Sequence, residues 1–381
     1  MNIGPVRLPF GGDDPDRDRR VVIGAIVMLV ALGLPSLDSS LGLNLGTKLI
    51  PIGVFIILAL GLNVVVGFAG LLDLGYAAFF AIGAYTAAFL TSPSSTILQA
   101  LDAKPVDFWI AMLASTAVAA LFGVILGAPT LRLRGDYLAI VTLGFGEIVP
   151  LVIRNTPQWT RGVQGMNPIG TPTVPGVKFG FETEPWYYLV VGILVLSVVL
   201  TARLRDSRIG RAWAAIREDE VAAASMGVNP VTTKLFAFSL GASFSGFAGS
   251  VWASYLQTID PGQFDFSVSI FVLVMIILGG MGNIAGVIAG GLILGSFDRI
   301  LSDLISDTLK GIGAAFQIDV LRAADVSRAR SLIFGVALVG MMLLRPEGLF
   351  PSARRKMELH AAEEDETEAA QARATLFETR R

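Results

Sequence analysis

Residues 48–67 read KLIPIGVFIILALGLNVVVG, and this stretch decides the class of fold. After Lys48 it continues for 19 residues without a charged side chain. A helix needs about 20 predominantly apolar residues to cross the roughly 30 Å of hydrocarbon in a bilayer. The stretch therefore predicts one membrane-spanning helix, and the rest of the chain has to be compatible with a bilayer.

Nine further apolar runs have the same character, and most of them have a similar length. They lie at roughly 21–37, 75–91, 109–131, 137–153, 186–203, 232–255, 267–280, 284–298 and 331–345. The sequence thus predicts an all-α fold, a polytopic transmembrane helical bundle of about 8–10 spans, with ten as the preferred count.

Three of these runs require a choice. The run 21–37 resembles a signal peptide, but no small-x-small cleavage site follows it, so we expect an uncleaved first helix. The runs 267–280 and 284–298 are short, at about 21 Å each for a helical rise of about 1.5 Å per residue. We prefer a tight hairpin of two full spans to a re-entrant pair shielded by protein.

The composition agrees with a membrane protein and excludes several kinds of site. Hydrophobic residues make up 53% of the chain and charged residues 16%, against about 25% charged in soluble domains. The chain has no Cys, and its one His, His360, lies in a polar tail. We therefore expect no catalytic residue, no metal site and no cofactor. The net charge of −2, without a basic face, gives no reason to expect a nucleic-acid partner.

Basic side chains orient the spans, because loops rich in Lys and Arg stay in the cytoplasm. They cluster at residues 1–20, 132–134, 203–217 and 345–356. Loops between these clusters, such as 256–266, carry acidic residues and no Lys or Arg. We therefore expect both termini on the cytoplasmic side.

Three regions follow from this orientation. We expect a cytoplasmic N-terminal segment at 1–20, a transmembrane domain at 21–350 and a charged, solvated cytoplasmic tail at 351–381. The loop 299–330 agrees least with the scheme, because it carries five basic residues on the expected outer side.

Two carboxylates lie in or between the apolar runs. Glu147 lies within 137–153, and Asp73 lies in the sequence GLLDLG between two spans. A carboxylate in mid-helix costs about 2.5–3.5 kcal/mol on insertion scales, so it should face the bundle interior or water. For Glu147 we consider a pathway-lining or gating role and a structural carboxylate bonded to backbone freed by Gly and Pro150. For Asp73 a helix cap is the stronger alternative.

These few charges limit the class of transport. Two carboxylates without Lys or His partners are too few for a proton relay, and an ion channel would need a ring of charge or a carbonyl filter. The uncharged polar side chains suit a neutral or zwitterionic solute in a mostly apolar cavity. The candidate pathway residues are Asn63, Asp73, Tyr76, Tyr85, Thr142 and Glu147.

The segment at about 205–230 is too charged to lie in lipid, and it separates two spans. Strong helix formers predict one short amphipathic helix over 211–226, with Gly227 as its C′ residue and Pro230 as a stop. Such a helix can dock its apolar face into a groove on a soluble partner and act as a lever. The alternative is an interfacial helix resting on lipid headgroups, which its acidic centre at 218–220 disfavours.

Four blocks of sequence carry a resemblance to a known family. They are GLNVVVG at 61–67 continuing into GLLDLGY at 70–76 and AIGAY at 81–85, RGDYLAIVTLGFGEI at 134–148, the segment 205–230, and LGGMGNIAG at 278–286. In this order they resemble the ABC-importer permeases of the branched-chain amino-acid type, the LivM-like subunits. The resemblance covers about residues 21–350.

The resemblance implies a multi-pass subunit of the bacterial plasma (inner) membrane that carries branched-chain or other hydrophobic amino acids by alternating access. Its implied partners are a homologous second permease, two ABC ATPase subunits and an extracytoplasmic substrate-binding protein. ABC permeases dock on the ATPase through a loop with Glu-Ala-Ala followed by Gly. Val221 stands here where the generic Glu would be. The implied coupling residues are Arg211, Arg217, Glu218, Asp219, Glu220, Ala222, Ala223 and Gly227.

ATP hydrolysis is expected on partner subunits and not on this chain. No Gly-x-x-x-x-Gly-Lys-Ser/Thr motif occurs, and the nearest stretch, residues 46–49, lacks both the spacing and the hydroxyl. Three alternatives stay open. The cargo is urea or a short amide, as in closely related permeases; the chain is a stand-alone secondary transporter; or it is a membrane-embedded enzyme, for which no convergent His, Asp or Ser set is visible. Whether the two permeases are identical is also left open.

Overall fold

The computed structural model describes residues 45–130, 136–180, 182–302, 304–308, 310, 330–345 and 348–350. The expected first span at 21–37, the segment 1–20 and the tail 351–381 lie outside the described residues. Helices dominate the described part. Its strands are the two-residue β1 (Thr173–Val174) and β2 (Val177–Lys178), which pair antiparallel.

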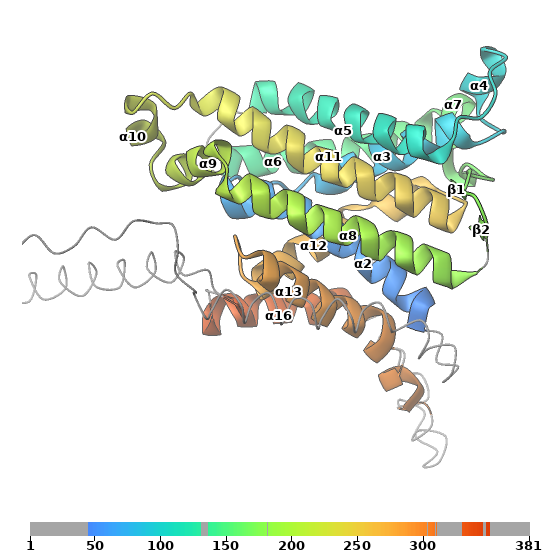
Figure 1. Cartoon of the computed structure of the whole chain (residues 1–381). Coiled ribbons are helices and arrows are strands. Elements are labelled where there is room, and N and C mark those ends of the chain that lie inside the picture. Colours follow the sequence, from blue (N-terminus) through green and yellow to red (C-terminus); the bar gives the residue numbers. More distant parts are fainter. Residues whose placement is uncertain are drawn as a thin grey trace, which may run out of the picture. The chain divides into compact units, whose positions relative to one another are not determined.

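Figure 1 shows the longer helices side by side in a bundle, with α9 and α10 at one end and β1 and β2 at the other. The α-helices are α2 (Leu45–Asn63), α3 (Tyr76–Thr91), α4 (Thr96–Ala100), α5 (Phe108–Thr130), α6 (Asp136–Asn155), α7 (Pro157–Thr160), α8 (Thr183–Asp206), α9 (Arg208–Glu218), α10 (Glu220–Ser225), α11 (Pro230–Leu256), α12 (Phe266–Gly279), α13 (Ile284–Ser296) and α16 (Arg330–Leu344). The π-helical turns η1 (Val64–Phe68) and η4 (Phe297–Leu301) continue α2 and α13, and the 3-10 turns are η2 (Gly162–Gln164) and η3 (Pro261–Phe264).

Seven helical segments of the described residues are long and apolar enough to cross a membrane. They are Gly46–Phe68, Phe108–Thr130, Tyr137–Asn155, Thr183–Asp206, Pro230–Leu256, Pro261–Gly279 and Ile284–Thr308. Two shorter apolar helices are Tyr76–Thr91 and Leu332–Leu344. Every apolar run from 48–67 onward thus coincides with a helix, and the expected all-α, polytopic bundle is confirmed. Both arms of the expected hairpin, α12 and α13, belong to segments long enough to span.

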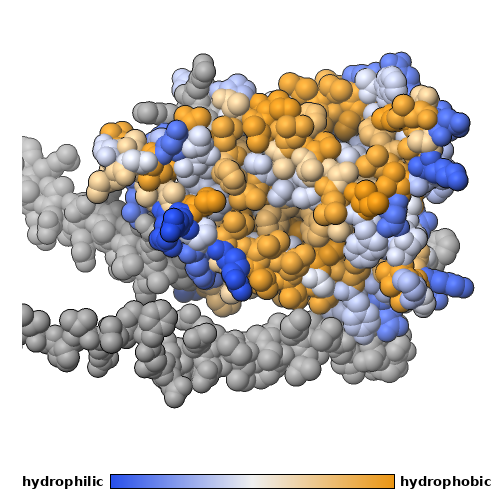
Figure 2. All heavy atoms as spheres, turned by 45° about the horizontal axis from the view of Figure 1, so that its top comes forward, coloured by the Kyte–Doolittle hydropathy of each residue, from blue (hydrophilic) through white to orange (hydrophobic). Residues whose placement is uncertain are grey.

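The surface has the pattern that a bilayer requires. Figure 2 shows hydrophobic residues in a broad band across the middle of one face, with polar residues gathered toward the two ends. The exposed large apolar side chains lie on α5, α6, α8 and α16, among others. Such a band would be costly in water but is the natural surface toward hydrocarbon.

The segment after residue 298 differs from the expectation. The sequence predicts a loop over 299–330, whereas the helical segment Ile284–Thr308 continues past residue 298 through the π-helical turn η4. Adjacent opposite charges explain how the helix tolerates this position, because Arg299 Nε lies 3.2 Å from the buried Asp298 Oδ2. Arg299 is therefore part of a helix, and residues 311–329 of the predicted loop lie outside the described residues.

α11 packs against both α3 and α5. Small residues make these contacts close. A Cβ atom added at Gly83 of α3 would lie 2.4 Å from the Cα of Gly246 in α11. A Cβ atom added at Gly123 of α5 would lie 2.8 Å from the Cβ of Ala242. In lipid, where apolar burial does not drive helices together, such backbone approach is a main source of helix association.

We expect Gly83→Val to destabilise the protein, because the new side chain would collide with the backbone of α11. Overpacking of a buried contact typically costs about 1–3 kcal/mol. The matched control is Gly192→Val, because an added Cβ at this exposed position of α8 meets nothing within 4 Å. Thermal unfolding of the purified protein in detergent should show a lower Tm for Gly83→Val than for the control. Equal Tm values would contradict the close α3–α11 contact.

Candidate functional site

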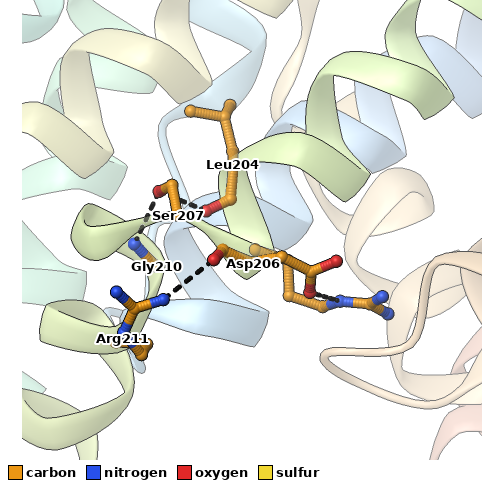
Figure 3. A network of polar contacts seen from close by, with 6 residues as sticks. Leu204, Asp206, Ser207, Gly210 and Arg211 are labelled. Atoms are coloured by element: carbon orange, nitrogen blue, oxygen red, sulfur yellow. Dashed lines mark hydrogen bonds and ion pairs between the residues drawn. The ribbon is translucent and has the colours of Figure 1, made fainter. Parts of the chain in front are cut away.

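The corner between α8 and α9 is held by side chains that bond the backbone of the turn (Figure 3). Ser207 Oγ accepts a hydrogen bond from Gly210 N at 3.1 Å and donates one to Leu204 O at 2.6 Å. Arg211 Nη1 donates to Asp206 O at 2.9 Å. A Cβ atom at Gly210 would lie only 2.4 Å from Leu204 O, so this position requires glycine. The last turn of α8 and the first turn of α9 are therefore connected rigidly.

The inner face of α9 is fixed to the beginning of α11. Trp213 is fully buried, and its Nε1 donates a hydrogen bond to Thr233 O at 2.8 Å. Ile216, one turn further along, is also buried. A buried Trp whose N–H is satisfied contributes both a large apolar contact and a directed bond. The apolar face of α9 thus packs on protein, whereas a helix resting on headgroups would turn this face to lipid.

The helix predicted over 211–226 is interrupted at Asp219, which corrects the expectation of one continuous helix. Asp219 has extended backbone angles, φ −151° and ψ 110°, and separates α9 from α10. Its Oδ1 accepts hydrogen bonds from Val221 N at 2.8 Å and Ala222 N at 3.0 Å. Asp is a preferred N-cap residue because its side chain satisfies the free N–H groups of the next helix. The local cap therefore prevails over the helix propensity of the surrounding residues.

An ion pair fixes α10 to α11. Glu220 Oε1 lies 2.8 Å from Lys234 Nζ, and the Lys234 side chain is only 7% exposed. A buried ammonium without a partner is strongly unfavourable. Loss of Glu220 would therefore destabilise the fold by leaving the Lys234 charge buried and unpaired, in addition to removing the contact itself. Glu220 is thus the acidic residue of this segment that faces the bundle.

Gly227 is the C′ residue at the end of α10, as the sequence predicts. Gly227 has φ +89°, a left-handed conformation that favours glycine. Gly227 N donates to Ala224 O at 3.0 Å, and Val228 N donates to Ala223 O at 3.1 Å. These two bonds form a Schellman motif, which satisfies carbonyl groups that the helix end leaves free.

Pro230 has a different role from the predicted stop. It is the first helical residue of α11, where its missing N–H costs nothing and its fixed φ suits the helix. Asn229 precedes it as the N-cap, and its Oδ1 accepts hydrogen bonds from Val231 N at 3.1 Å and Thr232 N at 3.3 Å. The chain thus passes from the end of α10 to the next span through only a few residues.

A junction connects α9 with two other parts of the bundle. Arg217 Nη1 donates to Gly67 O of η1 at 2.5 Å, and a Cβ atom at Gly70 would lie 2.7 Å from Arg217 Cγ. Asn63 Oδ1 accepts a hydrogen bond from Gly282 N, in the turn between α12 and α13, at 2.9 Å. We call the contacts of Arg217, Gly67, Asn63 and Gly282 the α9 junction. It brings the end of α2–η1, the end of α9 and the α12–α13 turn together.

The α9–α10 segment, defined here as Arg208–Gly227, is exposed over much of its surface. Five of the eight predicted coupling residues are exposed: Arg211, Glu218, Asp219, Ala222 and Gly227. Arg217 and Glu220 are partly exposed, and Ala223 is buried. Two apolar side chains beside them are also exposed, Val221 at 66% and Met226 at 87%. The segment thus offers a mixed charged and apolar surface.

Five of the six predicted pathway residues have buried side chains: Asn63, Asp73, Tyr76, Tyr85 and Thr142. Several of them bond the backbone of neighbouring helices. Tyr76 Oη donates to Gly241 O at 2.9 Å, and Thr142 Oγ1 accepts a hydrogen bond from Leu74 N at 3.1 Å. These residues therefore lie within helix contacts in this conformation and not on an open surface.

The two carboxylates are placed differently from each other. Asp73 is buried, and its Oδ1 accepts a hydrogen bond from Gly75 N at 2.9 Å, directly before α3 begins at Tyr76. This bond closes an Asx turn before the helix. The N-cap residue of α3 is Gly75 and no side chain caps it, so the expected helix cap by Asp73 is not formed. Glu147, in contrast, is exposed on α6. The sequence favoured a structural role for Asp73, but the pattern around Glu147 did not predict that this side chain is exposed.

Sequence reasoning missed the residues that anchor the segment from the side of the spans. Lys234 lies near the start of the apolar run 232–255, and a single Lys at such a position is a signal for an ion pair. Trp213, an aromatic residue among charged ones, is a similar signal. Gly282 contributes only a backbone N–H, so no side-chain pattern could have indicated its role.

The described residues contain no group of three or more His, Cys, Asp or Glu side chains placed to hold a metal ion. The arrangement is suited to transmitting movement. A segment that is bonded to α8, α11 and η1, and exposed on its other side, can pass the displacement of a partner to several spans at once.

Comparison with known proteins assigns this architecture to a family. The family profile described as "Branched-chain amino acid transport system / permease component" matches residues 44–345. The high-affinity branched-chain amino acid transport system permease protein LivM of Escherichia coli K12 is 39% identical over 328 residues, covering 80% of this chain and 70% of that protein. LivM of Salmonella typhimurium LT2 is 36% identical over 359 residues, covering 88% and 76%.

A second kind of permease is related more distantly. LivH of Escherichia coli K12 is 24% identical over 272 residues, covering 68% of this chain and 85% of that protein. No solved structure matches the chain. The profile match spans most of the helical bundle and the α9–α10 segment, and the LivM proteins match over still more of the chain. The chain therefore belongs to the family of permease components of branched-chain amino acid transport systems, and it is LivM-like.

Proposed function

We propose that this permease forms half of the translocation pathway of an ATP-driven importer for branched-chain or other hydrophobic amino acids. A homologous LivH-like permease forms the other half, two ABC ATPase subunits hydrolyse ATP, and an extracytoplasmic binding protein delivers the cargo. The relatedness of the chain to both LivM and LivH proteins supports a pair of different permeases. The α9–α10 segment is the surface on which the ATPases dock.

The observation that carries this proposal is the combination of firm attachment and outward exposure in one segment. Trp213 and Glu220 bind the segment to α11, and Arg217 binds it to η1. Val221 and Met226 of the same segment are exposed. Exposed apolar side chains in a segment that also exposes charged ones match the mixed composition of a docking surface.

The mechanism follows from the anchors. When ATP closes the two ATPases, the α9–α10 segment moves with them, and its bonds displace the beginning of α11 and the end of α2–η1. Because these helices are tightly packed, the displacement moves them as bodies and not as separate side chains. The cavity between the two permeases then opens to one side or the other, which is alternating access.

The orientation follows from the same segment. Residues 203–217 carry five Arg side chains, which the positive-inside rule places in the cytoplasm. The ATPases would then dock from the cytoplasm of a bacterial cell, with the chain in the inner membrane. The end of the bundle that carries β1 and β2 would face the binding protein.

The whole proposal can be tested by reconstitution. Leucine uptake into proteoliposomes should require this chain, the second permease, the ATPases, ATP and the binding protein together. Uptake by this chain alone would contradict the proposal and favour a secondary transporter.

The double substitution Val221→Asp with Met226→Asp should prevent the ATPases from docking, because two charged side chains would replace the two exposed apolar ones of the proposed docking surface. Removal of such central contacts commonly costs at least about 2 kcal/mol, or roughly 30-fold in affinity. The measurement is co-purification of ATPases with the tagged permease. Val163→Asp, at a 71% exposed apolar position between α6 and α8, is the matched control. Undiminished co-purification of the double variant would rule out this docking surface.

Arg217→Ala should uncouple the importer without dissociating it, because the contact with Gly67 O is lost while the exposed side of α10 is unchanged. We expect leucine uptake to fall about tenfold, the effect of losing one charge-assisted hydrogen bond. ATPase co-purification should persist. Arg208→Ala removes the same charge from an exposed position of α9 and serves as the control. If both variants transport equally well, the α9 junction does not carry the movement.

A further inference from the structure

The exposed face of α6 differs from the other exposed faces of the bundle. Its exposed large apolar side chains follow the three- and four-residue spacing of one helix face: Tyr137, Ile140, Val141, Ile148, Leu151 and Val152. Glu147 is exposed in the middle of this stripe. The opposite side of α6 packs on the bundle, where Gly146 approaches the backbone of Gly75 and Phe145 lies against Phe79 with ring centroids 5.3 Å apart.

Glu147 lies at the depth where a bilayer is most hostile to charge. α6 has 20 residues and is therefore about 30 Å long, which equals the hydrocarbon thickness. Glu147 lies about 16 Å from its first residue and about 12 Å from its last. A carboxylate at this depth has to face protein or water, because contact with lipid tails is strongly unfavourable.

The other exposed faces show what a lipid-facing surface looks like in this protein. α5 carries no ionisable residue at all, and α8 carries them only in its terminal turns. α5 exposes Leu, Ile and Val side chains, and α8 exposes Leu and Val. The face of α6 therefore has a different environment from these two.

The surroundings of Glu147 fit a small solute with a cationic group and an apolar body. No hydrogen bond or ion pair joins its carboxylate to another described residue. One turn earlier, at Gly144, an added Cβ would meet nothing within 4 Å, so the surface is open beside the carboxylate. Val141, Ile148 and Leu151 border this opening with exposed apolar side chains.

We propose that the α6 face around Gly144 and Glu147 lines the water-filled pathway between the two permeases, and that Glu147 holds the ammonium group of the passing amino acid. The carboxylate attracts the cationic end, while the apolar neighbours contact the hydrocarbon side chain. This inference rests on the proposed function for the identity of the cargo. The exposure of the face to water, and its preference for cations, do not depend on that identity.

The first experiment uses the absence of Cys from the sequence, which allows a single thiol to be placed on this chain. Gly144→Cys is introduced in the complete transporter, together with cysteine-free partners. The probes are two water-soluble methanethiosulfonates, one with a trimethylammonium group and one with a sulfonate. Both should modify the thiol, with a preference for the cationic reagent. That preference should fall about tenfold when Glu147→Gln is added, as expected for one unit charge about 6 Å away in water.

The control is Leu196→Cys, at a 48% exposed position in the middle of α8, which should react with neither reagent because it faces lipid. No modification at Gly144→Cys would show that the partner permease or lipid covers the α6 face, and would overturn the proposal. Modification with the same charge preference in both backgrounds would overturn the role of Glu147. This experiment needs no cargo, so its failure is distinguishable from failure of the proposed function.

The second experiment measures leucine uptake. Glu147→Gln should lower uptake about tenfold or more, the loss of one charge-assisted hydrogen bond to the ammonium group. Glu147→Asp keeps the charge and should retain more uptake than Glu147→Gln. Equal uptake by Glu147→Gln and the unaltered protein would overturn the proposal. Co-purification of the partners and the Tm of each variant exclude misfolding as the cause, and if Glu147→Gln does not assemble, the comparison of Glu147→Asp with the unaltered protein decides.

Discussion

The close approach of helix backbones is the constraint on which the rest of this structure depends. In lipid there is little apolar driving force between helices, so they are held by packing and by hydrogen bonds. α11 satisfies this condition on two sides, through Gly246 against Gly83 of α3 and through Ala242 against Gly123 of α5. Because the backbones nearly touch, the three helices cannot slide independently. A displacement of α11 must therefore displace its neighbours.

This constraint supports the role in transmitting movement that is proposed for the α9–α10 segment. Trp213 and Glu220 bind the segment to the first turns of α11. In the proposed mechanism, a displacement of the segment would therefore reach a helix that packs closely on α3 and α5. Arg217 reaches a second helix through the carbonyl of Gly67, and Asn63 on that helix holds the α12–α13 turn. Two routes thus begin within ten residues of each other on one exposed segment. A flexible loop at this position would absorb a movement of the proposed partner, whereas a capped and anchored pair of short helices is able to transmit it.

Hydropathy predicted the helices well, because an apolar run of span length has few other possibilities in a chain of this composition. It predicted the detail of the polar segment less well. In the sequence, Asp219 looks like one more charged residue within a single helix. Only its hydrogen bonds show that it is the N-cap residue of a second helix, α10. The continuation of α13 beyond residue 298 was missed for a related reason, because an adjacent Asp–Arg pair looks like the start of a loop when the two charges are considered separately.

The side of the helix on which a polar residue lies was the hardest feature to predict. It distinguishes intramembrane polar groups that bond neighbouring backbone from those that are exposed on the surface of the bundle. Tyr76 and Thr142 bond backbone atoms of their neighbours, so they complete the helix packing and need no solute. Glu147 belongs to the same kind of apolar run, but the rotation of α6 about its axis turns it outward. That rotation is fixed in part by Gly146, about 100° around the helix from Glu147, which allows α6 to approach Gly75. The same close packing that holds the bundle together therefore also decides which carboxylate is exposed, and this exposure is the basis of the pathway role proposed for Glu147.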